Sequence, residues 1–264
     1  MKKILFIILA ITVISCNSNN NKNLSSPDGK ISLDFKIENG VAIYSVKKNN
    51  STIVNDSEMG ILFSDGTDLS SNLSVKSSNQ KSFNEDWHPL YGEEEKINNH
   101  YNELKISLTN QKNEFDIIFR AYDDGIAFKY VVPEQKNFSN YDIIDEKTEF
   151  NLSSKDSALW IPAFSYRRYE FLHAYSSVDD ISKEFFSKHV EDISYDTLGI
   201  DAAHTPLTIK MNDGSFISIH EANLVDFSSM TIAPRGEGKL EVELYPWADG
   251  IKVKSNDGIN SPWR

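Results

Sequence analysis

The chain has 264 residues, of which 39% are hydrophobic and 25% are charged. These proportions are those of a globular protein, so they exclude a wholly disordered chain and a collagen-like repeat. A net charge of −12 without a basic cluster argues against nucleic acid as a partner, and a single cysteine excludes an internal disulfide and a cysteine-based structural zinc site.

The first sixteen residues have the layout of a secretory signal. Lys2 and Lys3 precede a mostly apolar run over residues 4–14, which is too short to cross about 30 Å of hydrocarbon. Residues 13–16, Val-Ile-Ser-Cys, resemble the bacterial lipobox, in which the chain is cleaved before a cysteine that is then acylated. We therefore expect a signal peptide over residues 1–15 and lipidation at Cys16. The alternative is a buried Cys16 in an N-terminal strand.

Lipidation would anchor the protein to a membrane through its acyl chains, facing the periplasm or lying at the outer membrane. Residues 17–23 are polar and have no apolar period, so residues 16–23 are expected to form a flexible tether. We expect one folded domain over residues 24–264.

Within that domain, apolar residues alternate with polar ones in short stretches, which predicts strands with one face toward a core. These stretches begin at Ile31, Leu104, Phe115, Ile126, Leu207 and Leu240. Turn dipeptides such as Asn39-Gly40 and Asp124-Gly125 separate them and favour antiparallel hairpins. A short helix is predicted from Ser177, and the domain is expected to contain at most one or two short helices. The absence of strand–helix–strand alternation predicts an all-β antiparallel domain.

Several motifs occur in a fixed order along this domain. They are Trp87 with Gly92-Glu93, HYNEL (100–104), FRAYDDGIAFKY (119–130), EKTEF (146–150), WIP (160–162), HEANLVDFSSM (220–230) and SPWR (261–264). Their order and spacing resemble the N-terminal domain of glycoside hydrolase family 97, a bacterial α-glucosidase and α-galactosidase family. The resemblance implies an antiparallel β super-sandwich similar to the galactose-mutarotase fold.

In that family a catalytic (β/α)8 barrel follows the sandwich, and SPWR is the motif that leads into it. The barrel supplies both carboxyl groups that glycoside hydrolysis requires. Because the sequence stops at Arg264, we expect the barrel to be missing. No catalytic residue is therefore assigned, and the chain alone is expected not to hydrolyse glycosides.

Glu221 is the candidate metal ligand. Alternation places it in phase with Ile217 and Ile219, toward an apolar face, where a carboxylate needs a cation or hydrogen-bond donors. The resemblance implies that the glutamate of this HEA motif ligates calcium beside the substrate. One carboxylate would leave that calcium site incomplete in this chain. The alternative is a strand-end glutamate paired with a lysine or arginine.

Other residues have structural interpretations that we favour. His204 and His220 could form an acid/base set with Glu221, as in sugar epimerases of similar fold, but ordinary strand histidines are the better interpretation. Trp87 and Trp160 are expected in the core, and Trp263 is expected at an interdomain surface. Two further expectations are an Arg120 pair with Asp123 or Asp124, and a solvated turn at residues 93–95.

Three functions remain open. The first is the accessory sandwich of a truncated or split family 97 glycosidase that acts on an α-linked oligosaccharide or glycoside. The second is a free-standing surface lipoprotein that binds oligosaccharides without turning them over. The third is a mutarotase-like epimerase that uses the sandwich itself. The motifs favour the first.

Overall fold

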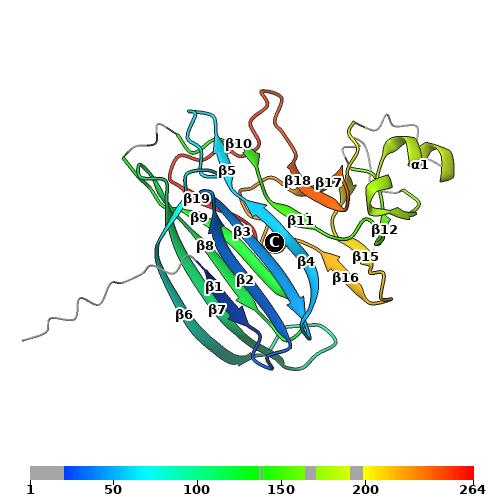
Figure 1. Ribbon diagram of the computed structural model, residues 1–264, viewed down its shortest axis with the longest axis horizontal. Coiled ribbons are helices and arrows are strands. Elements are labelled where there is room, and N and C mark those ends of the chain that lie inside the picture. Colours follow the sequence, from blue (N-terminus) through cyan, green and yellow to red (C-terminus); the bar gives the residue numbers. More distant parts are fainter. Residues whose placement is uncertain (1–20, 137, 139, 164–170, 191–198) are drawn as a thin grey trace, which may run out of the picture.

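The computed structural model describes residues 21–136, 138, 140–163, 171–190 and 199–264. The predicted signal peptide and Cys16 lie outside these residues. Within the described part, no helix is long and apolar enough to cross a membrane. Figure 1 shows a body built of strands, with short helical segments at one end.

The first group of strands forms two antiparallel sheets that lie face to face (Figure 1). One sheet has the order β1-β2-β3-β4 and the other the order β19-β9-β8-β7-β6. Their bounds are β1 Lys22–Ser25, β2 Ile31–Glu38, β3 Val41–Lys48, β4 Ser51–Met59, β6 Ser74–Trp87, β7 Ile97–Thr109, β8 Glu114–Ala121, β9 Ile126–Val132 and β19 Ile259–Asn260. The rings of Phe35 and Phe119, 5.9 Å apart, join the two sheets in a shared core.

The second group forms three further antiparallel sheets, with the orders β10-β5, β11-β18-β17-β14 and β13-β12-β15-β16. Their bounds are β5 Ile61–Phe63, β10 Ile143–Glu146, β11 Glu149–Asn151, β12 Ser157–Trp160, β13 Ala174–Ser177, β14 Ala203–His204, β15 Leu207–Lys210, β16 Phe216–Ile219, β17 Met230–Gly236 and β18 Lys239–Leu244. Strand β11 contacts β4, and one cluster of buried apolar side chains runs through both groups. The two groups therefore share one hydrophobic core.

The hairpin of β2 and β3 shows how the sequence specifies these strands. Apolar residues alternate along β2, and Leu33 and Phe35 are buried while their neighbours are half-exposed. The connecting Asn39 and Gly40 both have positive φ, 52° and 80°, as a tight hairpin turn requires. Gly40 also lies against Asn72, so a side chain there would be crowded as well as strained.

The all-β prediction is confirmed, but the predicted helix from Ser177 is wrong as a single element. The structure has a 3-10 helix, η1 (Val178–Asp180), and a separate α-helix, α1 (Lys183–His189). The extended backbone of Ile181 separates them, because its side chain is fully buried in the core. The α-helix is capped by Ser182, whose side chain accepts a hydrogen bond from Phe185 N, while Ser177 makes no such bond.

The folded domain also begins slightly earlier than expected. Strand β1 starts at Lys22, which pairs with Phe35 of β2, and Asn23 pairs with Asp34. The last two residues of the expected tether are therefore part of a sheet, since edge pairing with β2 satisfies their backbone groups without an apolar pattern.

Candidate functional site

The last six residues run between the two groups of strands. Strand β19 pairs with β9, and beyond it the backbone of Arg264 exchanges two hydrogen bonds with Phe128, at 2.8 and 3.0 Å. Between these contacts Trp263 makes an antiparallel bridge to Ala222. This segment therefore places Trp263 and Arg264 beside the HEA motif.

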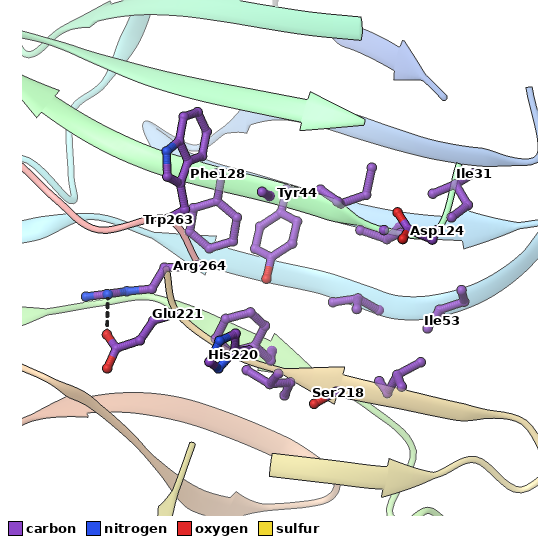
Figure 2. Close-up of a pocket in the computed structure, with 18 of the residues that line it drawn as sticks. Ile31, Tyr44, Ile53, Asp124, Phe128, Ser218, His220, Glu221, Trp263 and Arg264 are labelled. Atoms are coloured by element: carbon purple, nitrogen blue, oxygen red, sulfur yellow. Dashed lines mark hydrogen bonds and ion pairs between the residues drawn. The ribbon is translucent and has the colours of Figure 1, made fainter. Parts of the chain in front are cut away.

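Arg264 is the centre of a buried cluster of charges. Its guanidinium group donates to Glu146 through Nη2 at 2.9 Å and Nε at 3.3 Å, and to Glu221 through Nη1 at 2.9 Å. The arginine and Glu146 are fully buried, and the side chain of Glu221 is 10% exposed. Figure 2 shows Glu221 and Arg264 facing each other across this ion pair. One cation thus compensates two carboxylates that would be costly to bury alone.

Glu221 lies just beyond β16 and is held from two sides. Both of its carboxylate oxygens accept from the backbone N–H of Met230, at 3.1 and 3.2 Å. Burial raises the pKa of Glu221, although the charge of Arg264 and the Met230 hydrogen bond oppose that effect. These are the contacts of a strand-end glutamate paired with an arginine, and they fix the direction of the carboxylate.

A cavity of about 350 Å³ adjoins this cluster. Apolar side chains line it, among them Tyr44, Ile53 and Phe128, and Glu221 and Arg264 lie at one end (Figure 2). His220 also lines the cavity, whereas His204 does not. The imagined acid/base set of both histidines and Glu221 is therefore not assembled around this cavity, and burial lowers the pKa of His204.

Comparison with known proteins then identifies the family to which this chain belongs. The family model described as Glycosyl-hydrolase 97 N-terminal matches residues 24–264. The chain belongs to glycoside hydrolase family 97. The retaining α-galactosidase of Bacteroides thetaiotaomicron is 24% identical to this family 97 domain over 254 residues, which are 94% of the chain and 36% of that relative. A probable retaining α-galactosidase of Streptomyces bingchenggensis is 21% identical over 241 residues, covering 91% and 33% of the two chains.

Solved structures agree with this relationship. A family 97 enzyme from Pseudoalteromonas sp. strain K8 in complex with panose is 31% identical and superposes with a TM-score of 0.81, over 92% of this chain and 35% of that one. A complex of a family 97 enzyme from the same strain with acarbose gives the same values. A β-arabinopyranosidase, at 20% identity and a TM-score of 0.75, shares the fold. The family 97 domain thus spans about a third of the length of the relatives it matches.

The described residues offer a calcium ion only part of a site. Calcium takes six to eight oxygen ligands, and no group of three or more His, Cys, Asp or Glu side chains that could hold a metal occurs in the described part of the domain. Glu146 is already engaged by Arg264 and by the Thr148 hydroxyl at 2.9 Å. Glu221, in contrast, has lone pairs left for a cation at the edge of the cavity. Its carboxylate fits the role of one oxygen ligand, and a complete calcium site would need further oxygens.

The indole of Trp263 belongs to a stack beside this site. The guanidinium carbon of Arg120 lies 4.3 Å from the ring centroids of both Trp263 and Tyr101, and Lys129 Nζ lies 5.0 Å from the Trp263 ring. Arg120 Nε donates to Glu103 Oε2 at 2.9 Å. The expected pairing of Arg120 with Asp123 or Asp124 is therefore wrong, because its neighbour across β7 and β8 is an acidic residue.

The other candidates have mixed outcomes. Trp160 is in the core, as predicted, but Trp87 is 47% exposed, so its core assignment is wrong. Trp87 ends an edge strand that has a partner on one side only. The side chains of residues 93–95 are exposed, in agreement with a solvated turn.

The partnership of Glu146 with Arg264 was not predicted from the sequence. Glu146 lies in the EKTEF motif and Arg264 in the SPWR motif, but neither was assigned a role. A usable signal existed, since a Glu221 that points toward an apolar face requires a cation, and Arg264 is the basic residue in the SPWR motif.

Proposed function

We propose that this family 97 domain is the N-terminal part of a glycosidase that acts on α-linked oligosaccharides or glycosides, and that Glu221 is its one ligand to a calcium ion at the active site. The observation that carries the proposal is the directed carboxylate of Glu221, held by Arg264 and Met230 N at the end of the cavity. Relatives named α-galactosidases and structures with panose and acarbose support the substrate class.

In this proposal the domain prepares the site and does not carry out the bond cleavage. Arg264 keeps Glu221 in one position, and the hydrogen bond from Met230 N stabilises the negative charge of the Glu221 carboxylate. Calcium, when bound, supplies a positive charge that can polarise a substrate oxygen. Its remaining ligands, and the two carboxyl groups for hydrolysis, would come from a (β/α)8 barrel. That barrel would lie in the two thirds of the enzyme outside the matched N-terminal region.

A chimera tests this assignment. Residues 21–264 replace the matched third of the Pseudoalteromonas enzyme, and glucose release from panose is followed against calcium concentration. We expect Glu221→Gln to raise the calcium concentration for half-maximal activity by at least about tenfold. The control is Glu184→Gln in α1, an exposed carboxylate that pairs with Lys188. An unchanged calcium dependence in a folded Glu221→Gln chimera would exclude the ligand role.

The isolated chain provides the complementary measurement. With one available carboxylate, it should show no hydrolysis of panose and no rise in melting temperature at 1 mM calcium beyond that at 1 mM magnesium, since weak binding stabilises little. Panose binding by the isolated chain, seen by calorimetry, would instead favour a free-standing oligosaccharide-binding protein.

We also propose that the protein is exported and anchored to a membrane by acylation at Cys16, on the periplasmic side or at the outer membrane. The lipobox-like residues before Cys16 support this. Metabolic labelling with an alkyne fatty acid in a bacterial host should label the protein, and Cys16→Ser should abolish the label. Labelling that survives this substitution would contradict the proposal.

A further inference from the structure

The hairpin of β6 and β7 extends past the sheet to which it belongs. The two strands pair from Ser74 with Thr109 to Trp87 with Ile97. Strand β8 covers β7 only as far as Asn102. Residues 83–87 and 97–101 therefore form a two-stranded ribbon, which we call the distal ribbon, and β6 is the edge strand (Figure 1). Two strands alone are marginally stable in water.

Two apolar cross-strand pairs lie on one face of the distal ribbon, on either side of a polar pair, Glu85 with Asn99. Alternation puts Phe83 and Trp87 on the same face of β6, opposite Tyr101 and Ile97 of β7. The rings of Phe83 and Tyr101 stack with centroids 5.2 Å apart.

The opposite face is polar. There Asn98 Nδ2 donates to Asn84 Oδ1 at 2.9 Å and to Asp86 Oδ1 at 2.8 Å. The distal ribbon thus carries its aromatic side chains on one face only, as expected where that face lies against a covering layer.

The tip of the hairpin adds exposed apolar side chains close to Trp87. Leu90 is 99% exposed and Tyr91 90% exposed, next to Trp87 at 47%. Apolar side chains gathered in this way on a surface indicate a contact with another surface. Residues 93–95, all glutamates, follow at once and place negative charge beside them.

At its base, the face that carries Phe83 and Tyr101 reaches the candidate site. Tyr101 stacks on one side of Arg120, and Trp263 lies on the other side. The next residue, Arg264, holds Glu221. A series of contacts through Tyr101, Arg120 and Trp263 therefore links the base of the hairpin to the calcium-ligand candidate.

We propose that this surface, formed by Phe83, Trp87, Leu90, Tyr91 and Trp263, docks the catalytic part of a family 97 enzyme. The inference rests on the proposed function. Relatives are about three times as long as their matched region, so such a partner exists in the family. The acidic tip fits a partner patch that is apolar and rimmed with lysine or arginine. A sugar is the poorer occupant, because Leu90 is aliphatic and sugars need converging polar groups.

Hydroxyl-radical footprinting with mass spectrometry tests the proposal in the isolated chain and in the chimera described above. Oxidation of Trp87, Leu90 and Tyr91 should be at least fivefold slower in the chimera than in the isolated chain. Trp247, an exposed tryptophan on the loop after β18, is the matched control and should change less than twofold. Unchanged oxidation of Trp87, Leu90 and Tyr91 in a folded chimera would overturn the proposal.

Other occupants would give different patterns. Protection of these residues in the isolated chain by panose would assign the surface to sugar, and protection that grows with the concentration of the isolated chain would assign it to a second copy. Either result would overturn the docking proposal. Glu221→Gln in the same chimera separates the two hypotheses. If Trp87, Leu90 and Tyr91 are not protected but Glu221→Gln still raises the calcium requirement, only the docking proposal is contradicted. If these residues are protected but Glu221→Gln leaves the calcium requirement unchanged, only the proposed function is contradicted.

A second measurement needs no chimera. If the distal ribbon depends on a covering partner, amides of residues 97–101 in the isolated chain should exchange with deuterium at least tenfold faster than those of residues 104–108. Equal exchange rates would show that the ribbon is stable alone and would remove the physical basis of the proposal. The double substitution Leu90→Asp with Tyr91→Asp should lower the melting temperature of the chimera and leave that of the isolated chain within 1 °C.

Discussion

Arg264 binds Glu146 and Glu221 at the same distance, 2.9 Å, and so joins the strand-end glutamate to the core of the sandwich. Glu146 is further fixed by Thr148, and the Thr148 hydroxyl also bonds to Tyr130 Oη at 2.7 Å. The position of Glu221 therefore depends on a buried polar network that reaches strand β9, and each member of that network can be tested.

Replacing Arg264 should be severe. Arg264→Leu leaves two buried carboxylates without their cation, and we expect the free energy of unfolding to fall by about 3–5 kcal/mol in urea denaturation. The control is Arg235→Leu, whose partly exposed guanidinium pairs with Glu241 and Glu243 and should cost less than about 1 kcal/mol. Equal losses in the two variants would mean that the buried network does not stabilise the domain.

Tyr130→Phe removes a hydroxyl that has two partners. Gly60 N donates to Tyr130 Oη at 3.2 Å, and Thr148 bonds to it from the other side. Because both partners are buried, we expect a loss of about 1–3 kcal/mol, again measured by urea denaturation. Tyr175→Phe, at an exposed tyrosine of β13, should change stability by less than about 0.5 kcal/mol. A neutral Tyr130→Phe variant would contradict the network.

Gly60 is required for close packing and not for an unusual backbone. A Cβ there would lie 2.3 Å from the Cβ and 2.5 Å from the Cα of Ser70. Gly60→Ala should therefore destabilise the domain by about 1–3 kcal/mol or more, through a forced backbone shift. At Gly125 an added Cβ meets nothing within 4 Å, so Gly125→Ala should be nearly neutral. The stability of both variants is compared with that of the wild type by thermal melting. Similar effects at both positions would argue against the steric explanation.

Glu103 should make the stability depend on acid pH. Burial raises its pKa, but hydrogen bonds from Arg120 and Lys81 outweigh that effect and hold the pKa below its usual 4.5. The unfolded chain then binds this proton more readily than the folded one, so the stabilisation is present above pH 4.5 and is lost as pH falls through the lowered pKa. Glu103→Gln should flatten the stability profile below pH 4.5 relative to wild type, whereas Glu184→Gln provides the exposed comparison. A profile identical to wild type would contradict this.

The strands that could be predicted from the sequence are those with one buried face. Strands β2, β8 and β18 alternate between buried and half-exposed positions, and each coincides with a predicted stretch. Strand β6 escaped prediction because 12 of its 14 residues are exposed, so it carries no alternation to detect. It is a strand because β7 offers an unpaired edge, which is a tertiary cause.

The candidate site was predictable only in part. Alternation indicated that Glu221 faces an apolar region, and the motif resemblance singled it out. The need for a cation near Glu221 could be deduced, but its contact with Arg264 depends on where the closing segment crosses Ala222, which the sequence pattern does not show. Likewise Arg120 pairs with Glu103 because the register of β7 and β8 places the two residues opposite each other. That register cannot be read from their separation in the sequence.

The closing segment also bears on how the domain is made in the cell. Its backbone bonds to Phe128 on one side and to Ala222 on the other, so it is the seam between strands synthesised early and strands synthesised late. While the ribosome is still translating, β9 lacks this neighbour and Glu146 lacks its cation. The closing segment can therefore join the two groups of strands only after residue 264 has left the exit tunnel, and until then the unpaired strand edges are exposed to wrong pairing.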